Sequence, residues 1–155
     1  MTVPTFQDAE VILRLYDQYE SDRLRQARIW FDRELGDTDY ESFRQRFPQG
    51  SDGLLQFRTL YGFFEMVGVL YKNGLVHPDL LFDMWYINGF YARLYPVIEG
   101  IRGEGDIHVA ENFERLALAE LTWIGKEKGE AYVPAVPYAD KARKDILTSL
   151  QAGGE

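Results

Sequence analysis

The sequence predicts an all-α fold, a single-domain helical bundle of five to seven helices around a central antiparallel helical hairpin. Three observations support this prediction. Apolar residues recur at intervals of three and four along most of the chain, which is the period of an amphipathic helix. Glycine and proline residues separate these segments at positions where helices end or begin. The length of 155 residues suits one hydrophobic core and is too short for two.

The first two predicted helices lie before Gly36. Thr5 and Asp8 have the spacing of a capping box, so the first helix begins at Thr5. Its apolar stripe consists of Ile12, Leu15, Tyr16 and Tyr19. Ser21 and Asp22 supply caps for a second helix that runs to Leu35 and ends at Gly36. Because no glycine or proline separates the two segments, one long kinked helix fits equally well, and both alternatives stay open.

The central part of the chain predicts the hairpin. A short helix from Asp39 to Phe47 is followed by a turn at residues 49–53. The next helix covers residues 52–73 and stops at Gly74, and Pro78 occupies the first turn of a helix over residues 78–95. The short connection makes these two helices an antiparallel pair. Pro96 either kinks the second of them or begins a short fifth helix that ends in the loop at residues 102–105.

The C-terminal third contains a predicted helix and a tail. The helix covers residues 106–126 and has Phe113, Leu116, Ala117, Glu120 and Ile124 on one side. We assign residues 1–129 to the bundle domain. Two prolines favour extended backbone over residues 130–138, and an amphipathic helix follows over residues 139–150. This tail, residues 130–155, packs on its own domain, reaches a neighbouring subunit or binds a partner.

Composition and charge argue against several classes of function. The net charge of -8 and the pI near 4.8 do not suit a protein that binds the phosphate backbone, so no nucleic-acid partner is expected. The arginines between residues 23 and 33 alternate with acidic residues and predict a solvated helix face. The absence of cysteine excludes disulfides, thiolate nucleophiles and cysteine metal sites. The N-terminus lacks the pattern of a signal peptide, and no apolar run spans a bilayer, which predicts a cytoplasmic protein without a membrane partner.

The candidate ligand-binding residues lie on the two helices of the predicted hairpin. Arg58, Glu65 and Lys72 are seven residues apart and therefore form one stripe on helix 52–73. This stripe either faces water, faces another subunit or lines a polar cleft, in which Glu65 would suit acid–base chemistry. The candidate set for a pocket between these helices is Arg58, Tyr61, Glu65, Asp83 and Trp85. Gly62 and Gly68 are further predicted positions of close approach by another helix.

Motifs for metal or covalent chemistry are lacking. The sequence has no Glu-x-x-His pair of the kind that holds metals in helical bundles, and no metal or other cofactor is expected. Glu111 and Glu114, with Asp17 and Glu20 opposite, are a weaker alternative for a magnesium-dependent phosphohydrolase. The chain also lacks a Gly-x-Ser-x-Gly motif and a phosphate-binding loop. These absences favour a protein that acts by binding over an enzyme.

Three stretches carry a resemblance to a known family. ARIWF at residues 27–31, the block at residues 63–85 that ends in LLFDMW, and NFERL at residues 112–116 resemble a family of small bacterial helical proteins classed as a domain of unknown function. The resemblance covers about residues 10–125. It implies an all-helical bacterial domain, and it supplies no activity, cofactor or catalytic residue.

The function expected from the residues is protein interaction or assembly as a homo-oligomer. Both helices of the predicted hairpin are apolar over more of their circumference than a small lone domain needs. The tail is the candidate exchange arm or partner-binding helix. The alternative is a small-ligand-binding protein or enzyme with a pocket around Glu65.

Overall fold

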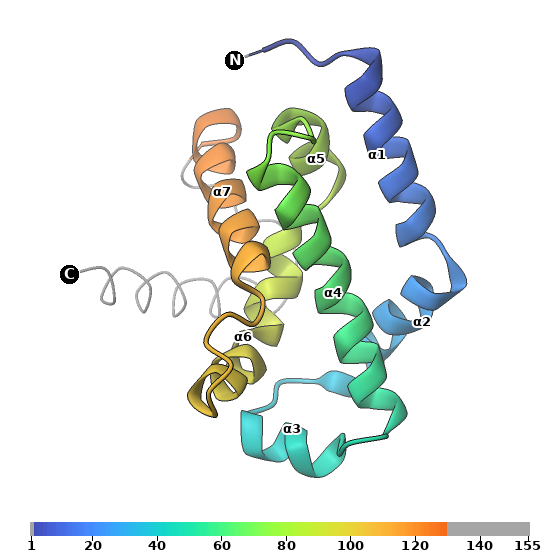
Figure 1. The fold of residues 1–155 in the computed structure, drawn as a ribbon, viewed down its shortest axis with the longest axis vertical. Coiled ribbons are helices and arrows are strands. Elements are labelled where there is room, and N and C mark those ends of the chain that lie inside the picture. Colours follow the sequence, from blue (N-terminus) through green and yellow to red (C-terminus); the bar gives the residue numbers. More distant parts are fainter. Residues whose placement is uncertain (1, 130–155) are drawn as a thin grey trace, which may run out of the picture.

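The all-α prediction is confirmed. A computed structural model describes residues 2–129, which contain α-helices and no strand (Figure 1). The elements in order are α1 (Phe6–Tyr19), α2 (Asp22–Trp30), the π-helical turn η1 (Phe31–Leu35), α3 (Tyr40–Arg46), α4 (Asp52–Lys72), α5 (Pro78–Met84), α6 (Ile87–Gly103) and α7 (Glu111–Glu127). The tail predicted for residues 130–155 lies outside the described residues.

Local caps set the helix boundaries in the first half of the chain. The capping box at α1 is confirmed, because Thr5 Oγ1 accepts from the Asp8 amide and Asp8 accepts from the Thr5 amide. Ser21 Oγ accepts from the Leu24 amide at 3.4 Å and begins α2 as a separate helix. This cap decides between the two open alternatives, since α1 and α2 are distinct helices and not one kinked helix. Gly36, at φ +63°, ends the π-helical turn η1, which continues α2.

The core surrounds α4. This helix makes its most extensive contacts with α7 and its next most extensive with α2. In Figure 1 α4 and α7 lie side by side and run in the same direction along the molecule. Aromatic rings fill the contact: Phe64 stacks on Phe113 with ring centroids 5.1 Å apart, and Phe90 packs against Phe64 at 4.8 Å. Such ring pairs stabilise a core beyond the area that they bury.

The structure corrects the predicted central hairpin. Residues 78–95 are not one helix, because Trp85 and Tyr86 are non-helical and separate α5 from α6. The principal partner of α4 is α7, and the antiparallel pair is α6 with α7, whose contacts join the start of α6 to the later turns of α7. Helical periodicity shows which face of α4 is apolar, but it does not identify the helix that covers that face.

Two other boundaries differ from expectation. Pro96 does not begin a new helix, since α6 continues through it to Gly103. The helix predicted from residue 106 begins at Glu111, after Ala110, which has a left-handed backbone with φ of 57°. The intervening residues 104–110 form a loop beside α3. Among the helices that the structure describes, none combines the length and apolar character needed to cross a membrane.

Candidate functional site

The Glu65 carboxylate binds the N-terminus of α7. Its Oε2 accepts from the Phe113 amide at 2.8 Å, and its Oε1 accepts from the side chain and the amide of Asn112 at 2.8 and 3.3 Å. The first amides of a helix lack partners within the helix, and a carboxylate there is also favoured by the helix dipole. Glu65 is therefore engaged in joining α4 to α7.

A second carboxylate repeats this arrangement in the core. Glu120 on α7 is 1% exposed and accepts from the amides of Ile87 and Asn88, both at 2.8 Å, at the start of α6. The Asn88 side chain donates to Glu120 Oε1 at 2.6 Å and to the Ala117 carbonyl at 2.8 Å. The sequence placed Glu120 on the apolar side of its helix but did not identify this role. A carboxylate at a core position was the signal, because a buried charge requires partners.

Glycines on α4 show how closely α7 approaches. A Cβ built on Gly68 would lie 2.2 Å from the backbone oxygen of Asn112, so the close approach predicted there is confirmed. A Cβ on Gly62 would have no neighbour within 4 Å among residues 2–129, so the close approach predicted there is wrong for these helices. The difference arises because α7 begins beside the second half of α4.

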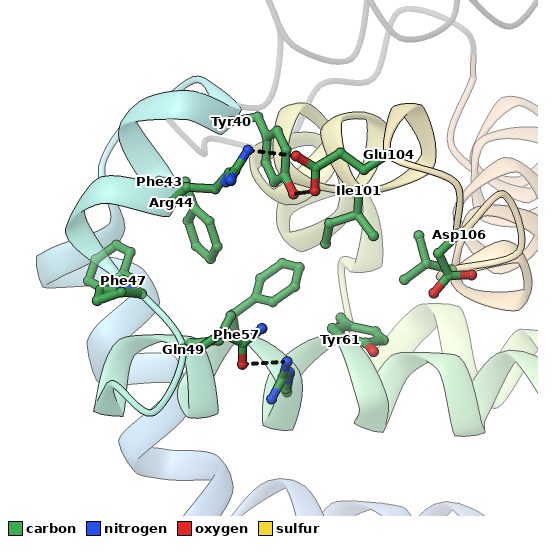
Figure 2. A pocket seen from close by; sticks show the side chains of 14 residues that line it. Tyr40, Phe43, Arg44, Phe47, Gln49, Phe57, Tyr61, Ile101, Glu104 and Asp106 are labelled. Atoms are coloured by element: carbon green, nitrogen blue, oxygen red, sulfur yellow. Dashed lines mark hydrogen bonds and ion pairs between the residues drawn. The ribbon is translucent and has the colours of Figure 1, made fainter.

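A hollow with an apolar and polar lining lies between α3, α4 and the end of α6. We call it the α3–α4 hollow. It has a volume of about 470 Å³, and Figure 2 shows Phe43, Phe57 and Ile101 pointing into it from three elements. Its other lining residues are Tyr40, Arg44, Phe47, Pro48, Gln49, Leu54, Arg58, Tyr61, Glu104, Asp106 and Val109. The floor is apolar and the rim carries charge.

The polar rim of the α3–α4 hollow has two parts. On one side Glu104 accepts from Arg44 Nη1 at 2.6 Å and from the Tyr40 hydroxyl at 2.7 Å. On the α4 side the exposed Arg58 donates a hydrogen bond to Gln49 Oε1 at 3.4 Å. Figure 2 shows Gln49 and Asp106 at separate ends of the α4 side.

The structure does not bring the five candidate residues together. Arg58 and Tyr61 line the α3–α4 hollow, which does not include Glu65. Asp83 and Trp85 line a separate hollow of about 290 Å³ beside α7. The Trp85 ring is buried against Tyr19, with centroids 5.6 Å apart, and Asp83 is exposed and pairs with Lys128 at 3.4 Å. The arrangement follows from the break after α5, which turns Trp85 into the core.

Acidic residues near the start of α7 are engaged within the protein. Glu114 accepts from the Tyr91 hydroxyl at 2.7 Å and from Arg102 Nη1 at 2.5 Å. Burial raises the pKa of Tyr91, and the hydrogen bond to Glu114 raises it further. A hydrogen bond from His108 lowers the pKa of Glu111. Among residues 2–129 no group of three or more His, Asp or Glu side chains is arranged to hold a metal ion.

An exposed apolar stripe lies on α1, which forms one outer edge of the molecule in Figure 1. Ile12 and Leu15 face the core, whereas Phe6, Leu13 and Tyr16 are 95%, 63% and 43% exposed. At about 100° per residue these three side chains lie within one sector of α1 together with Ala9. We call Phe6, Ala9, Leu13 and Tyr16 the outer stripe of α1.

The fold and these sites define a helical domain without a recognisable catalytic centre among the described residues. The model of a domain of unknown function, DUF4760, matches residues 4–123, and the chain belongs to that family. This match confirms the resemblance to a domain-of-unknown-function family. No curated protein and no solved structure matches the chain.

Proposed function

We propose that this protein is an assembly module that forms a homodimer through the outer stripe of α1. The observation that carries the proposal is the exposure of Phe6 and Leu13, at 95% and 63%, on a helix whose opposite face is already buried. Large apolar side chains gathered on one exposed helix face are characteristic of interaction surfaces. A helix with two apolar faces can pack against the core with one face and bind a partner with the other.

The spacing of the outer stripe suits a second copy of the same chain. Its residues follow intervals of three, four and three, so the pattern is symmetric about its centre. In an antiparallel pair Phe6 would lie opposite Tyr16, and Ala9 opposite Leu13. A two-fold symmetric interface must be complementary to itself, and a symmetric stripe meets this condition.

Charges beside the stripe favour the same pairing. Glu10 and Arg14 lie one turn apart on its flank, are exposed, and make no ion pair with other residues in the described part of the chain. In an antiparallel dimer Arg14 of each copy would reach Glu10 of the other, which gives two ion pairs by symmetry. Pairs of this kind at the edge of an apolar seam set partner and orientation.

This proposal differs in location from the sequence-based one. The wide apolar surface of α4 suggested an oligomer, but α7 and α2 cover most of that surface within one chain. The outer stripe of α1 gathers three exposed large apolar side chains, Phe6, Leu13 and Tyr16, on one helix face.

The test is sedimentation equilibrium of the full chain and of two variants. We expect the unmodified chain to dimerise, Leu13→Glu to be monomeric, and Ile107→Glu to dimerise normally. Ile107 is the matched control, because it is 66% exposed and lies in the loop before α7. Circular dichroism of each variant checks that the fold is retained.

A charge exchange tests the orientation. Arg14→Glu places four acids at the symmetric centre and is expected to weaken the dimer, whereas Glu10→Arg combined with Arg14→Glu restores it. A chain that stays monomeric at every concentration, or a Leu13→Glu variant that dimerises as well as the unmodified chain, contradicts the proposal.

A further inference from the structure

We infer that the α3–α4 hollow binds a short peptide or amino-acid derivative that has a free carboxylate, a free amino group and an aromatic or other apolar side chain. This site is separate from the outer stripe of α1, and the inference does not depend on dimerisation. Three features of the hollow support it: its size and floor, the charges left available on its rim, and the positions of those charges.

The size and floor suit a small ligand with an apolar part. A volume of about 470 Å³ lies within the range of roughly 300–1,000 Å³ typical of small-molecule sites. Phe43 and Phe57 are 2% and 1% exposed and form a T-shaped pair with centroids 5.1 Å apart. Figure 2 shows both rings and Ile101 directed into the hollow, so an apolar side chain would rest on aromatic and aliphatic surfaces.

The rim leaves one cationic and one anionic group available. Glu104 is engaged by Arg44 and Tyr40, each of which donates one hydrogen bond to its carboxylate. Among residues 2–129, the partner of the Arg58 guanidinium is Gln49, through a long hydrogen bond of 3.4 Å. The Asp106 carboxylate takes part in no hydrogen bond or ion pair with residues 2–129, although its backbone carbonyl accepts from the Val109 amide.

These two groups select a zwitterion over a singly charged ligand. A guanidinium binds a carboxylate with two parallel hydrogen bonds, so Arg58 is the site for the ligand carboxylate. Asp106 is the site for the ligand amino group. Between them Tyr61 lines the hollow, and its hydroxyl, which makes no hydrogen bond to any other described residue, is available to the ligand backbone.

The positions of the charges favour a peptide longer than a single amino acid. Figure 2 places Gln49, the partner of Arg58, and Asp106 at separate ends of the hollow. An extended dipeptide spans about 7 Å, which separates its two termini by more than those of a free amino acid. The dipeptide phenylalanyl-glycine is therefore the probe of choice.

The experiment compares three forms of this probe by isothermal titration calorimetry with the full chain. The first has free termini, the second is N-acetylated, and the third is a C-terminal amide. We expect each blocked form to bind about tenfold more weakly or worse, because each loses one charge-assisted hydrogen bond.

Two variants test which residue binds each terminus of the dipeptide. With Arg58→Gln the free dipeptide and its amide should bind equally weakly, and with Asp106→Asn the free and acetylated forms should become equal. Arg23→Gln and Asp37→Asn are matched controls at exposed positions outside the hollow and should bind like the unmodified chain. All four positions are exposed, so the variants are expected to retain the fold.

The inference is overturned if the free dipeptide does not bind, or if it binds no better than its two blocked forms. Equal binding by the Arg58→Gln variant and its Arg23→Gln control overturns it as well. Repeating the titration with Leu13→Glu separates this site from the proposed dimer, since binding should not change.

Discussion

Glu120 accepts hydrogen bonds from both nitrogens of Asn88, at 2.8 Å from the backbone amide and at 2.6 Å from the side chain. The two residues are 32 positions apart, and their contact determines where α6 begins. Glu65 and Asn112 form the same kind of contact at the start of α7. In both cases a glutamate on one helix replaces the local cap that a distant helix lacks, and neither Tyr86 nor Ala110 provides a side-chain cap of its own.

The first prediction concerns the buried carboxylate. Glu120→Ala leaves the amides of Ile87 and Asn88 buried without an acceptor and should lower the free energy of unfolding by about 3 kcal/mol. Urea denaturation followed by circular dichroism measures this change. Glu127→Ala, near the exposed end of the same helix, is the control and should change stability by less than about 0.5 kcal/mol.

The second prediction concerns Glu65. Because its carboxylate is only partly buried, water can replace some of the lost hydrogen bonds, and Glu65→Ala should cost about 1–2 kcal/mol in the same assay. Dipeptide binding in the α3–α4 hollow should be retained. A loss of peptide binding with no loss of stability would restore Glu65 as a ligand-binding residue and contradict its role as a cap.

The third prediction compares two glycines of one helix. Gly68→Ala forces its Cβ against the Asn112 backbone, which cannot move without shifting α7, and should destabilise the fold by about 2–3 kcal/mol. Gly62→Ala meets no neighbour within 4 Å and should raise stability by about 0.5–1 kcal/mol, because alanine favours the helix. Thermal unfolding should therefore show opposite shifts in Tm. Equal shifts for the two variants would contradict the close contact between α4 and α7.

The fourth prediction concerns alkaline pH. Burial and the bond to Glu114 raise the pKa of Tyr91 above its ordinary value of 10.0, so the folded state keeps a proton that the unfolded state loses. The resulting stabilisation is fully present below pH 10 and is lost as pH rises beyond it. Urea denaturation of Tyr91→Phe should show a shallower decline above that pH.

Helix ends were predictable where their signals are local. The Thr5 and Asp8 capping box, Pro78 in the first turn of α5 and the turn at Gly74 each depend on residues within about four positions of one another. The break at Trp85 and Tyr86 was not predictable in this way. The apolar pattern continues across this break. The amide at the start of α6 is bound by Glu120, which lies on α7 and is far away in the sequence.

The candidate site was also predictable only in its local features. The spacing of seven residues correctly placed Arg58 and Glu65 on one stripe of α4, but the two residues meet different neighbours. Arg58 lies beside α3 and the α3–α4 hollow, whereas Glu65 lies at the start of α7. Periodicity gives the direction of a side chain around its helix and contains no information about which distant element stands there.

The sequence by itself determined the all-α class, the helical faces and the ends of the capped helices, because these depend on periodicity and on hydrogen bonds between near neighbours. Only the tertiary structure decided that α7 rather than the following helix covers α4, that Glu65 and Glu120 act as caps for distant helices, and that Phe6, Leu13 and Tyr16 of α1 stay exposed. The physical reason is that buried amides and apolar faces can be satisfied by many partners, and the choice among them is made only when all the helices pack together.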